Sequence, residues 1–94
     1  MSDEVARKIR VTGRVQGVWF RGWTVDAATS LGLRGWVRNR RDGSVEALLI
    51  GPEAAVHQMI QRCNEGPSTA RVDRVAVHHG EDDGSRDFQQ VATV

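Results

Sequence analysis

Residues 13–21 read Gly-Arg-Val-Gln-Gly-Val-Trp-Phe-Arg, and the spacing of apolar residues changes across this stretch. Before it, apolar side chains alternate from Ile9 to Val15, which predicts a strand with one buried face. After it, apolar side chains recur at offsets of 3, 7, 8 and 11 from Phe20 as far as Leu31, which predicts a helix. The stretch is therefore expected to form a glycine turn between a strand and a helix.

The rest of the chain continues the alternation of strands and helices. The expected elements are a strand over 33–39, a turn at 41–43, a strand over 44–50, a helix that Gly51-Pro52-Glu53 opens with Pro52 in its first turn, and a strand over 71–79. Residues 88–94 can add a short last strand. The alternation there is weak, because the polar Gln90 falls on the same face of the strand as the apolar Phe88. The order predicts an α+β fold, the ferredoxin-like βαββαβ sandwich, with an antiparallel sheet and two helices on one face.

Composition limits the possible partners of the chain. Its 94 residues predict one domain, residues 1–94. The 13 basic and 12 acidic side chains give a net charge of +1, which is too little for a general nucleic-acid or membrane surface. Cys63 is the single cysteine, and neither a signal peptide nor an apolar stretch of about 18 residues is present. We expect a cytoplasmic monomer that binds neither nucleic acid nor membranes.

The glycine turn has the features of an anion site. Backbone N–H groups at such a turn and at the helix start that follows it can converge on an anion. Arg21 stands at the positive end of the helix dipole, where a cation destabilises the helix by about 0.3–1 kcal/mol. A phosphate bound between the guanidinium and the helix end would make the interaction favourable. The expected cradle consists of Arg14, Val15, Gln16, Gly17, Val18, Trp19 and Phe20. From these residues alone, a phosphate cradle and an ordinary turn remain equally open.

Two segments resemble the acylphosphatase family: "GRVQGVWFR" at 13–21 and "GLRGWVRNRRDGSVEALLIGP" at 32–52. The similarity runs from about Ile9 to Val77. The resemblance implies hydrolysis of the carboxyl–phosphate anhydride of a small acyl phosphate to a carboxylate and inorganic phosphate, with no metal and no cofactor. It also implies that Arg21 binds the phosphoryl group, that Asn39 holds the attacking water and that the backbone of residues 14–20 forms the phosphate cradle.

Trp19 departs from the family pattern, which more often has glycine or another small residue at this position. Its side chain either lines the pocket and selects aromatic acyl groups or packs over the loop. Phe20 and Trp23 are expected in the core. A basic group on the hairpin beside Asn39 is either a solvated surface or a steering surface for anions; it consists of Arg38, Arg40 and Arg41.

Other functions have weaker support in the sequence. An RNA-recognition module stacks bases on aromatic residues of its central strands, and the segments 8–15 and 44–50 contain none. The histidines do not cluster with Cys63 or with carboxylates at metal-ligand spacing. A non-catalytic regulatory or anion-binding domain of the same fold is the main alternative, since related domains begin larger carbamoyl-transfer proteins that mature hydrogenases. The presence of both Arg21 and Asn39 favours the enzyme.

Overall fold

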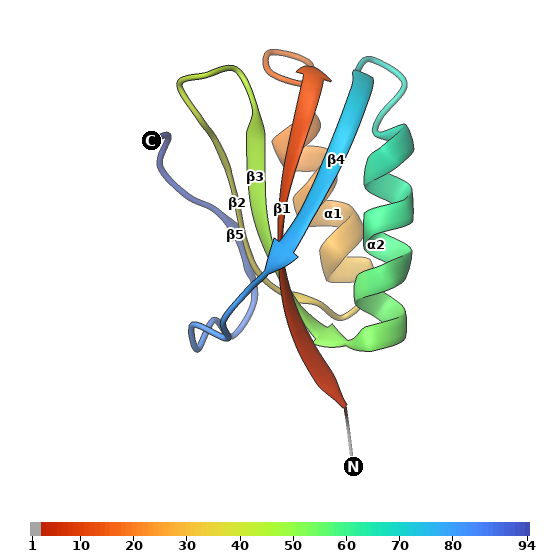
Figure 1. Ribbon diagram of the computed structural model, residues 1–94, viewed down its shortest axis with the longest axis vertical. Coiled ribbons are helices and arrows are strands. Elements are labelled where there is room, and N and C mark those ends of the chain that lie inside the picture. Colours follow the sequence, from red (N-terminus) through yellow and green to blue (C-terminus); the bar gives the residue numbers. More distant parts are fainter. Residues whose placement is uncertain (1–2) are drawn as a thin grey trace.

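The computed structural model describes residues 3–94; Met1 and Ser2, which belong to the expected domain, lie outside the described residues. Strands and helices follow the predicted order (Figure 1). They are β1 (Glu4–Arg14), α1 (Phe20–Ser30), β2 (Arg34–Asn39), β3 (Val45–Pro52), α2 (Glu53–Glu65), β4 (Arg71–His79) and β5 (Phe88–Gln90). The tail therefore forms a fifth strand, which the sequence had left open.

The strands form one five-stranded sheet in the order β4-β1-β3-β2-β5. β1 pairs antiparallel with β3 and β4, and β3 pairs antiparallel with β2. β5 differs, because it runs parallel to β2 with Phe88 opposite Gly35. The sheet expected to be antiparallel is thus mixed at this edge. The cause is the connection through residues 80–87, which carries the chain from one edge of the sheet to the other.

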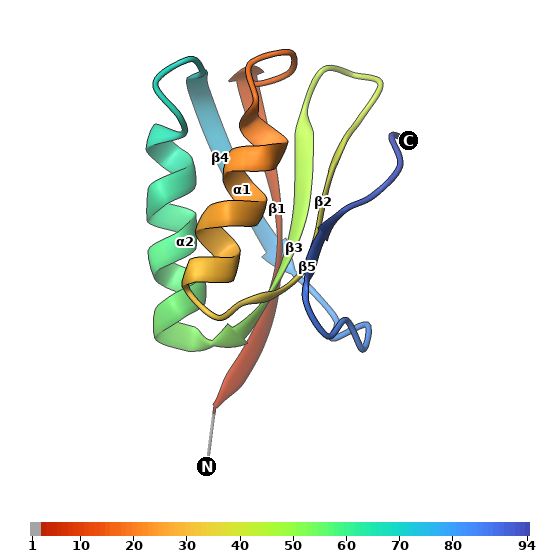
Figure 2. The ribbon, with the colours of Figure 1, turned by 180° about the vertical axis from the view of Figure 1, so that it is seen from behind.

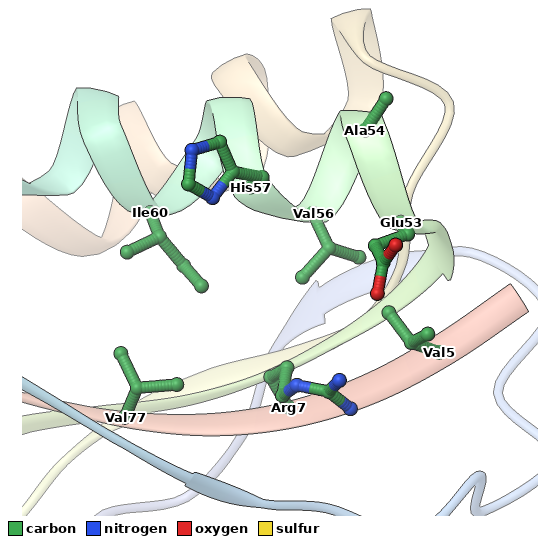
Figure 3. A pocket seen from close by; sticks show the side chains of 8 residues that line it. All are labelled: Val5, Arg7, Glu53, Ala54, Val56, His57, Ile60 and Val77. Atoms are coloured by element: carbon green, nitrogen blue, oxygen red, sulfur yellow. The ribbon is translucent and has the colours of Figure 1, made fainter.

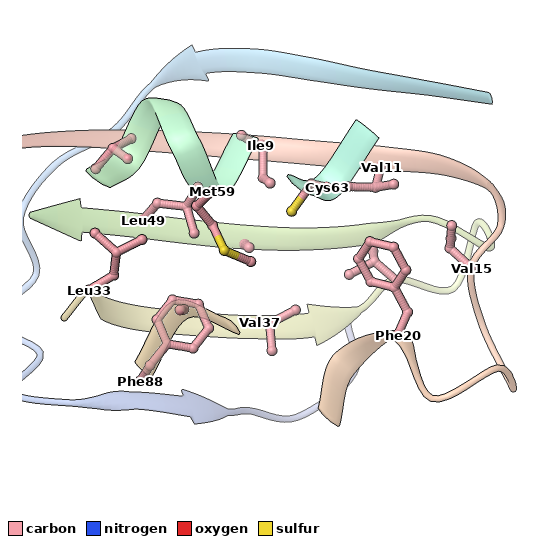
Figure 4. Packing of buried hydrophobic residues seen from close by; sticks show 14 residues of the cluster. Ile9, Val11, Val15, Phe20, Leu33, Val37, Leu49, Met59, Cys63 and Phe88 are labelled. Atoms are coloured by element: carbon pink, nitrogen blue, oxygen red, sulfur yellow. The ribbon is translucent and has the colours of Figure 1, made fainter. Parts of the chain in front are cut away.

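Both helices cover the same face of the sheet, as predicted (Figure 2). Phe20 at the start of α1 and Met59 and Cys63 on α2 pack with the inward side chains of the strands (Figure 4). Burial of a side chain such as that of Phe20, which is 2% exposed, stabilises the fold by about 1.5–3 kcal/mol. This contact anchors the start of α1 and therefore the end of the glycine turn.

The helix boundaries agree closely with the sequence pattern. α1 ends at Ser30, and Gly32 follows with a φ of 72° and donates its N–H to the carbonyl of Thr29 at 3.0 Å, as expected for a C-terminal cap. The placement of Pro52 in the first turn of α2 is wrong by one residue, because Pro52 is extended and the helix begins at Glu53. Within residues 3–94 neither helix has the length and apolar character needed to cross a membrane.

The end of β1 is bent by an irregular pairing between Thr12 and Gly13. Gly13 has a φ of 124°, and a Cβ at this position would lie 2.2 Å from the carbonyl oxygen of Arg71. Such a bulge redirects a strand and leaves room only for glycine. It turns the chain from the sheet towards the start of α1.

Gly13→Ala is expected to lower the free energy of unfolding by about 2–4 kcal/mol. The alanine backbone would be strained at a positive φ, and its Cβ would also clash with the backbone of β4. Gly43→Ala is the matched control. Gly43 also has a positive φ, 96°, but a Cβ there would meet nothing within 4 Å, so that only strain of about 1–2 kcal/mol is expected. Urea denaturation measures both losses. Equal losses in the two variants would contradict the clash at Gly13.

Candidate active site

The turn between β1 and α1 presents a run of free backbone donors. Gly17 and Trp19 both have left-handed φ values, 73° and 64°, and no side chain of the described part, residues 3–94, caps the start of α1. Within residues 3–94, the backbone N–H groups of residues 16–22 donate to no protein acceptor. Donors of this kind at a helix N-terminus form a site for an anion.

Arg21 adds a cation to this turn. It is the second residue of α1, its side chain is half-buried, and no carboxylate of residues 3–94 lies within ion-pair distance of it. It lines a depression of about 110 Å³. The other residues that line the depression are Val15, Gly17, Trp19, Phe20, Gly22 and Gln90. An unpaired guanidinium beside free N–H groups suits a phosphate dianion.

Gln16 connects the turn to the hairpin between β2 and β3. Its Nε2 donates to the carbonyl oxygens of Arg40 at 2.7 Å and of Ser44 at 2.8 Å. On the other side of the turn, the hydroxyl of Thr69 donates to the carbonyl of Val18 at 2.7 Å. The two contacts hold the turn between the hairpin and the loop before β4, which gather at one end of the molecule (Figure 1).

Asn39 lies at the end of β2, directly before the hairpin residue that Gln16 holds. Its side-chain Oδ1 is buried and has no hydrogen-bond partner within residues 3–94. The C-terminal segment runs alongside, since the N–H of Val94 donates to the Asn39 carbonyl at 3.3 Å. This oxygen is closed to solvent, and Asn39 does not line the depression beside Arg21.

Gln16→Met is expected to lower the free energy of unfolding by about 1–3 kcal/mol, because the variant keeps the side-chain length but loses both hydrogen bonds to the hairpin. If the hairpin holds Asn39 in place, kcat for acyl phosphate hydrolysis should also fall about tenfold while KM changes little. Thr69→Val, which loses one exposed bond on the other side of the turn, is the control. A rise in KM alone would contradict a positioning role for Gln16.

The predicted cradle residues differ in whether they line the depression. Val15, Gly17, Trp19 and Phe20 line the depression, as does Arg21. Three others do not: Arg14 is the last residue of β1, opposite Arg71; Gln16 directs its side chain to the hairpin; and Val18 is held through its carbonyl.

Sequence reasoning missed Gln90 and Thr69. Gln90 lines the depression from β5, and Thr69 donates to Val18 from 51 positions along the chain. The weak alternation around Gln90 was a local signal; Thr69 had none.

The basic side chains beside Asn39 are partly neutralised. Arg38 and Arg40 form ion pairs with Glu46 at 2.7 Å and 3.1 Å. Burial raises the pKa of Glu46, but the hydrogen bonds and charges of the two arginines outweigh burial and lower its pKa overall. Glu46 is therefore ionised at neutral pH, and its stabilising contribution falls as the pH drops through its folded-state pKa. Arg38 and Arg40 are thus ion-paired side chains of the hairpin.

A larger groove lies at the opposite end of β1. It holds about 580 Å³ between α2 and strands β1 and β4 (Figure 3). Its lining is mainly aliphatic, with Arg7, Glu53 and His57 as its charged or titratable residues. Size alone would favour this groove, but the carboxylate of Glu53 in its lining opposes an anion. The turn instead offers seven consecutive free N–H groups over residues 16–22 beside Arg21. The candidate site is therefore the smaller depression.

The thiol of Cys63 is buried and does not act as a nucleophile. Burial raises the pKa of the Cys63 thiol to about 12, which leaves the thiol protonated and unreactive. Within residues 3–94, no three His, Cys, Asp or Glu side chains gather closely enough to hold a metal ion.

Known proteins resemble the chain over most of its length. The family model described as Acylphosphatase matches residues 7–90. An acylphosphatase of Rhizorhabdus wittichii is 52% identical over 92 residues, which cover 98% of this chain and 93% of the relative. An acylphosphatase of Rhodospirillum rubrum is 62% identical over 69 residues, or 73% of this chain and 76% of the relative. The solved acylphosphatase of Bacillus subtilis is 36% identical, with a TM-score of 0.89, and the match covers 93% of this chain and 98% of that chain.

The same fold also occurs within a longer protein. A structure of full-length HypF in a phosphate- and nucleotide-bound form matches 99% of this chain but only 12% of its own length, with a TM-score of 0.91 and 29% identity. The sandwich, the glycine turn and these matches define a class of small hydrolases that act on acid anhydrides. The chain belongs to the acylphosphatase family.

Proposed function

We propose that the chain hydrolyses small acyl phosphates to a carboxylate and inorganic phosphate at the turn between β1 and α1. The observation that carries this proposal is the run of free N–H groups over residues 16–22 with the unpaired Arg21 beside it. Phosphoryl transfer requires mainly positioning and stabilisation of charge on the equatorial oxygens. Backbone donors and a guanidinium supply both without a metal ion.

Asn39 orients the attacking water in this proposal. Its side-chain amide, which has both a donor and an acceptor, hydrogen-bonds the water and orients it in line with phosphorus and the leaving oxygen. An amide is too weak a base to take the proton, so a substrate phosphate oxygen takes it. The leaving carboxylate is a weak base and needs no general acid, which fits a depression whose lining contains no carboxyl group.

The proposal also includes the cellular compartment and the oligomeric state of the enzyme. We place it in the cytoplasm as a monomer that meets a small-molecule substrate. The buried, unreactive thiol of Cys63 is compatible with a reducing compartment. The chain acts as a single domain, which one continuous hydrophobic cluster supports.

Phosphate release from benzoyl phosphate in the presence of a chelator tests the proposal. We expect rapid release at a rate that the chelator does not change. Folding is checked in the same sample by circular dichroism. A folded chain that releases no phosphate would reject the enzyme and favour a non-catalytic anion-binding domain.

A further inference from the structure

Trp19 differs from its neighbours in conformation and in exposure. Its φ of 64° is the only positive φ of a non-glycine residue within residues 3–94. The residue is 63% exposed, whereas the adjacent Phe20 is buried. Glycine adopts this conformation without strain, so the requirements of the turn alone do not explain a tryptophan. An exposed aromatic side chain at a strained position in an active-site turn points to a role for the indole ring itself.

Gly22 creates the space in which the indole lies. A Cβ on residue 22 would be 2.2 Å from Nε1 of Trp19 and 2.8 Å from Cδ1 and Cε2, so any side chain there would displace the ring. Glycine is also a poor helix former in the first turn of α1. Both residues line the same depression as Arg21. Together they hold an aromatic surface at the edge of the anion site.

We infer that Trp19 and Gly22 form a subsite for the acyl group and that the preferred substrates are acyl phosphates of aromatic acids. The inference rests on the proposed function. In an in-line displacement the acyl oxygen leaves on the side opposite the attacking water. Trp19 is the exposed aromatic residue in the lining of the depression, beside the space that the phosphate would occupy. An aryl group that leaves the phosphate there can pack against the exposed indole with offset or edge-to-face geometry.

The test compares kcat/KM for benzoyl phosphate with kcat/KM for acetyl phosphate. We expect the ratio to fall about three- to tenfold in Trp19→Gly, which relieves the backbone strain and removes the ring. Gly22→Ala should lower the same ratio although the indole is still present, because the new Cβ displaces it. Trp23→Phe is the control: its ring packs against Phe20 at 5.4 Å between centroids and does not line the depression, so the ratio should stay constant.

A binding measurement separates this inference from the proposed reaction. The probes are (2-oxo-2-phenylethyl)phosphonate and (2-oxopropyl)phosphonate, in which a methylene group replaces the bridging oxygen. Calorimetry should show tighter binding of the phenyl compound, with the preference reduced in Trp19→Gly and in Gly22→Ala. If the folded chain hydrolyses nothing but retains this preference, the reaction is rejected and the subsite stands. Equal affinities, or a preference that both variants retain, would overturn the subsite.

Discussion

Arg21→Ala is expected to reduce kcat/KM for benzoyl phosphate at least 10²- to 10³-fold, on the order of 3–4 kcal/mol of transition-state stabilisation. The guanidinium is the only charged group in the lining of the depression. Charge that develops on the phosphoryl oxygens would be left to the backbone N–H groups alone. Initial rates of phosphate release measure the effect, and competitive inhibition by inorganic phosphate should weaken in parallel.

The same substitution should leave the fold intact or stabilise it. A cation at a helix N-terminus is unfavourable by about 0.3–1 kcal/mol, and Arg21 has no ion pair within residues 3–94 to offset this cost. Thermal denaturation tests this. Arg21→Lys keeps the charge but loses the planar pair of donors, so an intermediate rate is expected. Activity of Arg21→Ala within tenfold of the unchanged chain would reject the assigned role.

Asn39→Ala is expected to lower kcat about 10²-fold while KM changes little. In the proposed mechanism Asn39 contacts the water and not the phosphate, so its loss affects the orientation of the nucleophile. The free energy of unfolding should stay the same or rise, because the buried Oδ1 has no partner within residues 3–94 and its desolvation is unfavourable. Steady-state kinetics and urea denaturation of the same preparation give both results.

Asn39→Asp separates water orientation from phosphate binding. The carboxylate keeps the shape of the side chain but brings a negative charge towards the phosphoryl dianion, so KM should rise as well as kcat fall. An Asn39→Ala variant with normal kcat and raised KM would show instead that Asn39 binds the phosphate, and the water would need another partner.

Local patterns were sufficient to predict most of the elements. The change of period across residues 13–21 predicted the end of β1 and the start of α1, and alternation over 71–79 predicted β4 with its observed bounds. Gly32 marked the end of α1 because left-handed backbone is a local requirement. The apolar face of α1 could be predicted from the sequence because its residues recur every three or four positions from Phe20.

The weak alternation of the C-terminal tail has a tertiary cause. Gln90 stands in phase with Phe88 because both face the helix side of β5, where Phe88 enters the core and Gln90 lines the depression beside Arg21. A polar residue at a position where the alternation calls for an apolar one weakens the prediction of a strand. Gln90 thus lies beside the candidate site and not in the core, which accounts for the weak alternation of the tail.

The sequence by itself determined the α+β class, the strand–turn–helix unit and, by resemblance, the candidate roles of Arg21 and Asn39. Only the tertiary structure decided that β5 runs parallel to β2, that Gln16 holds the hairpin beside the turn and that Trp19 lies on Gly22. Periodicity and turn chemistry act between near neighbours and leave a trace in local sequence. Contacts such as those from Gln16 to Arg40 and Ser44 join residues 24 and 28 positions apart, and they arise only when the whole sheet brings its loops together at one end.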